Sequence, residues 1–294
     1  MKVDMNQAQV NGITINYEDR GPAEGMPLLL VCGYTSTMMS WPIPLLEGLK
    51  EWGFRMIRFD NRDVGHSEKL KGIPDISVVA AAAREGKKPD VPYMLADMAA
   101  DGMALLDELG IARAHIMGIS MGGMIVQNMA INHPGKILSV TSIMSTTGNP
   151  ELPAASKKAM TALQERPASA EREVVLRHNM KGRRVYQSPA YPMSDEALYE
   201  RCAREYDHMY YPEGAARQYA AIIGDGSRVD RVIHGKADPL VPVEGGVDTA
   251  KSVPGAKLEL IEGMGHDLPV ELCPRYVELI TELAESANAR AAVE

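Results

Sequence analysis

The heptapeptide GISMGGM, at positions 118–124, places one serine among three glycines where one apolar stretch ends and another begins. The preceding segment RAHIMGIS (113–120) is typical of a buried strand, and the following MGGMIVQNMAINHPG (121–135) is typical of a helix. A strand that turns this sharply into a helix needs small residues two positions before and after its central residue. The stretch therefore predicts a strand, turn and helix with Ser120 at the turn.

Similar apolar runs and helical stretches alternate on both sides of this unit. MPLLLVCG (26–33) and FRMIRFD (54–60) are short, nearly continuous apolar runs, which are typical of strands covered on both faces of a sheet. Further runs of this kind are KILSVTSIMS (136–145), RVDRVIHG (228–235) and AKLELIEG (256–263). Helical patterns lie between them, most clearly over residues 95–109. This alternation predicts an α/β fold with a mostly parallel sheet flanked by helices.

Two segments depart from the alternation. Around Asn11-Gly12 the pattern is that of an antiparallel hairpin at the start of the chain. Between residues 149 and 222 the chain is helical, charged and marked by prolines, with no convincing buried strand. We therefore expect one core domain made of residues 1–148 and 223–294, with residues 149–222 inserted as a helical cap domain.

Composition narrows the possible partners. The 294 residues carry a formal net charge of −8, which argues against nucleic acid because binding to phosphate backbones depends on clustered Lys and Arg. The basic cluster Lys181-Gly182-Arg183-Arg184 is interpreted as a solvated surface turn. The three cysteines are scattered and have no zinc-ligand spacing. We expect no metal and no cofactor.

The first residues, MKVDMNQAQVNG, lack the apolar core of a signal peptide. No run approaches the roughly 18 apolar residues that suggest a membrane-spanning helix. We expect a soluble, cytoplasmic protein that does not bind a membrane.

Ser120 has two polar residues of the right type and order after it. VIHGKADPLVP ends a predicted strand and places Asp238 just beyond it, and LIEGMGHDLP ends the next strand and places His266. The carboxyl ends of parallel strands meet at one edge of a sheet, so these side chains should lie near Ser120. A histidine can take the serine proton while the acid orients the imidazole. The sequence thus predicts a catalytic triad of Ser120, Asp238 and His266.

Two members of this triad, Ser120 and Asp238, have an alternative. Ser120 is also compatible with a structural role as a helix N-cap, with the glycines serving only close packing. Asp225, between two glycines, is a second candidate for the acid, although the sequence after it resembles a plain connector. Asp238 is preferred because it directly follows the apolar strand.

Attack on a carbonyl also needs backbone N–H donors for the developing oxyanion. Met121 follows the proposed nucleophile at the start of its helix and supplies one candidate donor. The second is expected in the loop VCGYTSTMMSW (31–41), where Tyr34 after Gly33 is the best candidate.

Over almost its whole length the sequence resembles the α/β-hydrolase family. The matching motifs are GISMGG (118–123), GKADPLVP (235–242) and GMGHDLP (263–269). The segment FDNRDVGHSEK (59–69) resembles the family loop D-x-R-G-x-G-x-S, with Asp63 in place of the usual glycine. In this loop Asp60 and Arg62 are expected to form an ion pair that braces a turn.

The resemblance implies a hydrolase and leaves several reactions open. A serine nucleophile disfavours the dehalogenases and epoxide hydrolases of this family, which use aspartate. The combined motifs are also similar to those of bacterial methylesterases that act on aclacinomycin-type polyketides. Our first hypothesis is a carboxylesterase for a small to medium apolar ester. The alternatives are a carbon–carbon bond hydrolase of vinylogous diketones, a lactonase or perhydrolase, and a ligand-binding receptor that retains the triad.

The helical insertion should act as a lid over Ser120, because a segment leaving the sheet at this point emerges at the edge where the triad is expected. Methionines of the insertion, such as Met180, Met193 and Met209, are then expected to influence substrate preference. His178 and His208 also lie in the insertion and are weaker candidates for pocket-lining residues.

Overall fold

The computed structural model describes residues 5–225, 232–252 and 256–291, and it confirms the predicted α/β fold. The core is an eight-stranded sheet in the order β1-β2-β4-β3-β5-β6-β7-β8. Its strands are β1 Asn6–Val10, β2 Ile13–Arg20, β3 Met26–Val31, β4 Phe54–Phe59, β5 Ala114–Ile119, β6 Ile137–Ile143, β7 Val232–Gly235 and β8 Leu258–Ile261. The two pairings that involve β2 are antiparallel, and the neighbours from β4 to β8 pair in parallel.

The predicted hairpin at the start of the chain is confirmed. Val10 pairs with Ile13, and the two residues between them, Asn11 and Gly12, have φ values of 49° and 77°. Two consecutive residues at positive φ form the tight turn that matches the twist of an antiparallel pair. Of the predicted strand 228–235, residues 228–231 lie outside the described part of the chain, and β7 begins at Val232.

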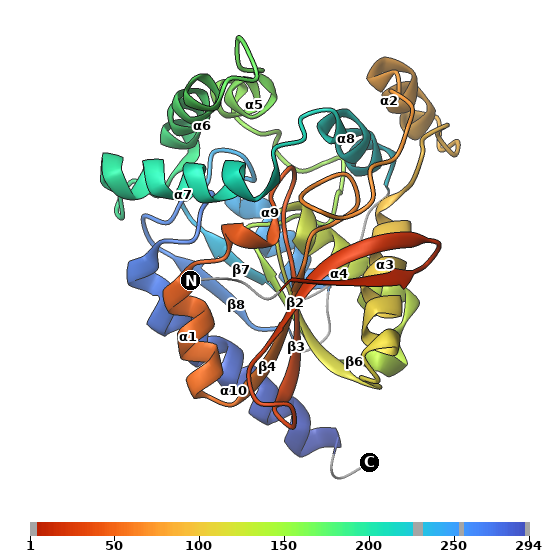
Figure 1. Ribbon diagram of the computed structural model, residues 1–294, viewed down its shortest axis with the longest axis vertical. Helices are drawn as coiled ribbons and strands as arrows, with labels where there is room; N and C mark the ends of the chain where they lie inside the picture. The colour runs from red at the N-terminus through yellow and green to blue at the C-terminus, as the bar shows by residue number, and fades with distance from the viewer. Residues whose placement is uncertain (1–4, 226–231, 253–255, 292–294) are drawn as a thin grey trace.

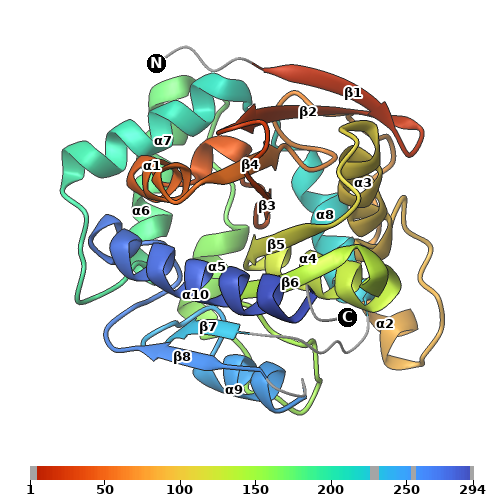
Figure 2. The same ribbon diagram turned by 90° about the horizontal axis from the view of Figure 1, so that it is seen from below.

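Helices cover both faces of the sheet, as Figure 2 shows from below. One face is covered by α1 (Ile43–Glu51) and α10 (Cys273–Ala291), and the other by α3 (Leu95–Glu108) and α4 (Met121–Asn132). Successive side chains of a strand point to opposite faces. On β3, accordingly, Leu28 and Leu30 pack in the cluster with α1 and α10, whereas Leu29 and Val31 pack in the cluster with α3 and α4.

A second group of helices lies beyond one end of the strands of the sheet. The chain between β6 and β7 forms α5 (Lys157–Gln164), α6 (Arg172–Tyr186), α7 (Asp195–Met209) and α8 (Gly214–Gly224). Figure 1 shows these helices together above the sheet, with α2 (Ile76–Arg84) beside α8. The connection from β7 to β8 forms α9 (Val243–Ser252).

Within the described ranges, every helix is too short or too polar to cross a lipid bilayer.

Candidate active site

Ser120 sits in a strained turn between β5 and α4. Its φ and ψ are 54° and −120°, a backbone conformation that residues other than glycine rarely adopt. Its side chain makes no hydrogen bond that caps the helix. A Cβ on Gly118 would lie 2.1 Å from the carbonyl oxygen of Gly122, and one on Gly122 would lie 2.2 Å from the carbonyl oxygen of Val31. The glycines therefore permit the tight turn. Ser120 occupies the N-cap position of α4, but its hydroxyl makes no capping hydrogen bond, which is the bond that the N-cap interpretation requires.

The structure brings Ser120, His266 and Asp238 into one hydrogen-bonded chain. Nε2 of His266 lies 3.0 Å from Oγ of Ser120, and Nδ1 of His266 lies 2.7 Å from Oδ2 of Asp238. The Asp238 side chain is fully buried, and its other oxygen, Oδ1, accepts backbone hydrogen bonds from Leu240 at 2.8 Å and Val241 at 2.9 Å. These two bonds hold the carboxylate in a fixed orientation toward the imidazole.

Asp225, the alternative acid, lies elsewhere. It follows the last residue of α8, and its Oδ2 accepts a hydrogen bond of 3.0 Å from the Asn128 side chain on α4. The carboxylate at hydrogen-bonding distance from His266 is that of Asp238.

The two residues predicted as oxyanion donors lie beside the serine. Met121 is the first residue of α4, where the positive end of the helix dipole favours a negative charge. Tyr34 follows Gly33, and a Cβ on Gly33 would lie 3.2 Å from Cβ of Ser120. Tyr34, Met121, Ser120 and His266 all line one cavity of about 250 Å³, which we call the serine cavity.

Most of the remaining lining of the serine cavity is apolar and comes from several elements. Met124 and Met144 contribute from the core, and Met160 and Leu163 of α5 contribute from the inserted helices. Of the methionines expected to shape the site, Met209 lines a neighbouring cavity of about 170 Å³, together with His178. Met180 and Met193 pack instead against the buried cluster of Leu176, Leu198 and Cys202 between α6 and α7.

The serine cavity also contains charged side chains that the sequence analysis did not place there. Arg183 of α6 and Arg201 of α7 line it. The interpretation of residues 181–184 as a solvated surface turn is wrong, because they belong to α6 and the Arg183 side chain is only 18% exposed. The sequence did contain a signal, since an arginine flanked at helical spacing by apolar residues is often covered along its stem.

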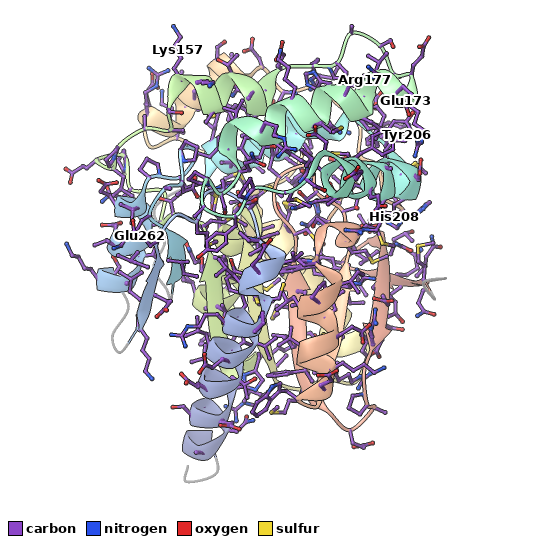
Figure 3. All side chains as sticks on the ribbon, turned by 90° about the vertical axis from the view of Figure 1, so that its left-hand side faces the viewer. Lys157, Glu173, Arg177, Tyr206, His208 and Glu262 are labelled. Atoms are coloured by element: carbon purple, nitrogen blue, oxygen red, sulfur yellow. The ribbon has the colours of Figure 1, made fainter. Side chains whose placement is uncertain are left out.

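The expected ion pair between Asp60 and Arg62 is also wrong. Arg62 donates instead to both carboxylate oxygens of Asp101, at 2.7 and 2.6 Å. Asp60 is surrounded by donors: the backbone N–H groups of Met38 and His66 and the His208 ring, whose Nε2 lies 2.8 Å from Oδ2. In Figure 3, His208 lies on the side of α7 that faces the core.

The electrostatics of Asp60 follow from these contacts. Burial by itself would raise the pKa of the carboxyl group, but the hydrogen bonds and charge of His208 and the backbone donors of Met38 and His66 lower it below the ordinary value. Asp60 therefore ties the loop of residues 59–69 to α7, and not to its own neighbour Arg62.

Asp63 connects the same loop to α8. Its φ of 69° explains why the related loop usually has glycine here. Its two oxygens lie 2.8 Å from Nε and Nη2 of Arg217, and Oδ2 also accepts a hydrogen bond of 2.7 Å from the Tyr93 hydroxyl. The side chains of Arg217 and Asp63 are 3% and 0% exposed, so this pair is removed from solvent.

Replacing Arg217 with methionine is expected to lower the free energy of unfolding by about 3 kcal/mol, because it leaves the Asp63 carboxylate buried without its cation. Urea denaturation measures the loss. Arg172→Met is the matched control: Arg172 also pairs with a carboxylate, that of Asp207, but both side chains are solvent-exposed, so little change is expected. The double variant Asp63→Gly, Arg217→Met should recover part of the loss. Equal stability of the two arginine variants would contradict the prediction.

No group of three or more His, Cys, Asp or Glu side chains suited to a metal ion occurs among the described residues. The three cysteines, Cys32, Cys202 and Cys273, are free and buried.

The chain is similar to several known proteins in sequence and in structure. Rhodomycin D methylesterase DnrP from Streptomyces peucetius is 27% identical over 287 residues, which cover 88% of this chain and 90% of the relative. The meta-cleavage product hydrolase CumD from Pseudomonas fluorescens IP01 superposes with a TM-score of 0.72 at 17% identity, covering 96% of this chain and 98% of that one. An esterase from Thermogutta terrifontis gives a TM-score of 0.71 at 20% identity, covering 97% and 99%.

The two solved structures establish the likeness of fold alone, because both are less than 25% identical. The sequence family described as alpha/beta hydrolase fold matches residues 26–271, which include the strained turn at Ser120 and the loops that carry Asp238 and His266. Because this match covers most of its length, the chain belongs to the alpha/beta hydrolase fold family.

Proposed function

We propose that this protein is a carboxylic ester hydrolase that uses Ser120 as its nucleophile. The observation that carries the proposal is the hydrogen-bonded chain from Ser120 through His266 to Asp238, which opens into a mostly apolar cavity. The likeness to a methylesterase over 88% of the chain supports ester hydrolysis as the reaction.

The proposed mechanism follows from the positions of these atoms. Nε2 of His266 accepts the Ser120 proton while Oγ attacks the ester carbonyl, and the Asp238 carboxylate stabilises the imidazolium that forms. The backbone N–H groups of Met121 and Tyr34 donate to the oxyanion of the tetrahedral intermediate. His266 then returns the proton to the leaving alcohol. Water, activated by the same imidazole, hydrolyses the acyl-enzyme and regenerates Ser120.

Residues 149–222 are proposed to form a cap domain over this site, with residues 1–148 and 223–294 as the core domain. The cap contributes Met160, Leu163, Arg183 and Arg201 to the lining of the serine cavity. It is held to the core by the Asp60–His208 and Asp63–Arg217 contacts. Substrate preference is then set mainly by cap residues, and the chemistry by core residues.

The size and lining of the serine cavity favour a small to medium substrate. A volume of about 250 Å³, lined largely by Met, Leu, Ile and Tyr side chains, suits an apolar acyl or alcohol group. No cofactor is part of the proposed mechanism, since the serine, imidazole and backbone donors supply the nucleophile, the base and the oxyanion stabilisation.

The proposal is tested with p-nitrophenyl acetate, butyrate, hexanoate and octanoate, followed by a dienoic vinylogous diketone. Turnover of the esters that is blocked by a serine-directed phosphonate supports the ester hydrolase. Turnover of the diketone alone would replace it with a carbon–carbon bond hydrolase. Binding of these compounds without turnover of any would indicate a ligand-binding protein instead.

Met160 provides a test of the cap. Met160→Ala enlarges the serine cavity. The ratio of kcat/KM for the hexanoate to kcat/KM for the butyrate should therefore rise about fourfold, the rate factor that corresponds to the free energy of burying one more methylene group. Met180→Ala is the control, because Met180 packs between α6 and α7 and should leave the ratio unchanged. Identical profiles for both variants and the wild type would contradict the cap assignment.

A further inference from the structure

A pair of arginine side chains lies in the wall of the mostly apolar serine cavity. Arg183 and Arg201 both line it, one from α6 and one from α7. They share one carboxylate, that of Glu205: Nη2 of Arg183 lies 2.6 Å from Oε2, and Nε of Arg201 lies 3.3 Å from Oε1. The three side chains are only 13–18% exposed, so this excess of positive charge is poorly screened by water.

Bracing α6 against α7 does not account for both arginines. The Arg183–Glu205 pair already connects the two helices, whereas Arg201 and Glu205 lie on the same helix, four residues apart. Nη1 and Nη2 of Arg201 make no hydrogen bond to any residue in the described part of the chain, although a guanidinium has five N–H donors. Arg201 therefore has donors left over at a cavity that contains the proposed nucleophile.

Two further charged side chains, Asp267 and Arg204, lie near this group. Asp267 also lines the cavity and interacts electrostatically with Arg201, while its oxygen Oδ1 accepts hydrogen bonds from the backbone and hydroxyl of Ser188. Burial raises the pKa of this carboxyl group above the ordinary value. Arg204 adds a further cation nearby and donates to the carbonyl oxygen of Met39. Burial, and then the positive charge of Arg183, lower the pKa of Arg201, whereas the carboxylates of Glu205 and Asp267 act in the opposite direction.

We infer that the guanidinium of Arg201, supported by Arg183, binds a carboxylate carried by the substrate. The planar guanidinium matches a carboxylate geometrically, and charge-assisted hydrogen bonds of this kind are strong where water is excluded. The inference rests on the proposed function and specifies its substrate class: an ester whose acyl or alcohol part carries a carboxylate at the end of a short apolar chain. Arg201 is then a specificity-determining residue.

The test compares esters that differ only in this charge. On the acyl side, mono-p-nitrophenyl glutarate is paired with p-nitrophenyl 5-methylhexanoate, in which an isopropyl group replaces the carboxylate. On the alcohol side, 4-acetoxybutanoate is paired with 4-methylpentyl acetate. In the wild type, the charged member of one pair should have a kcat/KM at least about tenfold above that of its neutral partner, the range of a charged hydrogen bond. The pair that shows this preference identifies the part of the ester that carries the carboxylate.

Arg201→Gln should remove this preference, so that the ratio of kcat/KM between the charged and the neutral ester of the pair falls about tenfold or more. Arg201→Lys should restore part of it, because it keeps the charge but not the planar pair of donors. Arg204→Gln is the matched control, since Arg204 lies on the same helix but does not line the serine cavity. If the neutral esters are hydrolysed and neither pair shows a preference that depends on Arg201, the inference is overturned and the proposed function stands.

A binding measurement separates the two hypotheses. Glutarate is titrated calorimetrically into the wild type, Arg201→Gln and Arg204→Gln proteins. If glutarate binds tenfold or more weakly to Arg201→Gln alone, the result supports the carboxylate subsite. It does so even if none of the esters is hydrolysed, a result that by itself would contradict the proposed function. Equal affinities in all three proteins, or no binding to any of them, would count against the subsite.

Discussion

Ser120→Ala is expected to lower kcat for ester hydrolysis about a million-fold, the size of loss that follows removal of the serine from a protease triad. The hydroxyl is the group that forms the acyl-enzyme, and its Oγ lies 3.0 Å from Nε2 of His266, the only side-chain hydrogen bond of that nitrogen among the described residues. What remains should be the small contribution of the oxyanion donors and of substrate binding. Steady-state assays with p-nitrophenyl butyrate measure the loss.

The fold should not change in this variant. Alanine keeps the Cβ and therefore the same strained φ of 54°, and the turn depends on Gly118 and Gly122 and not on the hydroxyl. The melting temperature should stay close to that of the wild type. A fluorophosphonate should add its mass to the peptide containing Ser120 in the wild type and leave the variant unlabelled. Turnover at the wild-type rate in Ser120→Ala would remove the nucleophile assignment altogether.

The features that were predictable from sequence are those set by short segments. The strand, turn and helix around Ser120 are dictated by two close backbone contacts that only glycine allows, at Gly118 and Gly122. The hairpin at Asn11-Gly12 and the buried strands follow from equally local patterns. That Asp238 and His266 lie close to Ser120 was predictable because chain order and strand ends determine which loops meet at one edge of a parallel sheet.

The contacts between the inserted helices and the core were not predictable in the same way. Asp60 and Arg62 are two residues apart, yet the Asp60 carboxylate contacts His208 on α7 and the Arg62 guanidinium contacts Asp101 on α3. Which oppositely charged partner each of the two side chains contacts depends on how helices from distant parts of the chain pack over the loop, and no spacing in the sequence encodes this. The same holds for the methionines. Met160 lines the serine cavity because of where α5 is placed, whereas Met180 packs between α6 and α7.

The choice between Asp238 and Asp225 gives the second large effect. Asp238→Asn is expected to reduce kcat about ten-thousandfold, as in a serine protease triad whose aspartate is replaced by asparagine. Asp225→Asn should cost less than about tenfold, which makes the difference in barrier roughly 4 kcal/mol. Kinetics of both purified variants on the same ester, with circular dichroism to check folding, measure the difference.

The reason lies in the orientation of the Asp238 side chain. An asparagine there can keep Oδ1 as the acceptor for the N–H groups of Leu240 and Val241, so its amide nitrogen is directed at Nδ1 of His266. An N–H donor at that position requires Nδ1 to be an acceptor, which moves the imidazole proton to Nε2 and leaves no base facing Ser120. Asp225, which follows α8, accepts a hydrogen bond from the Asn128 side chain on α4. Its replacement therefore leaves the tautomer of His266 unchanged. If Asp225→Asn proved the more damaging of the two, the acid would have to be reassigned, while Ser120 and His266 would keep their roles.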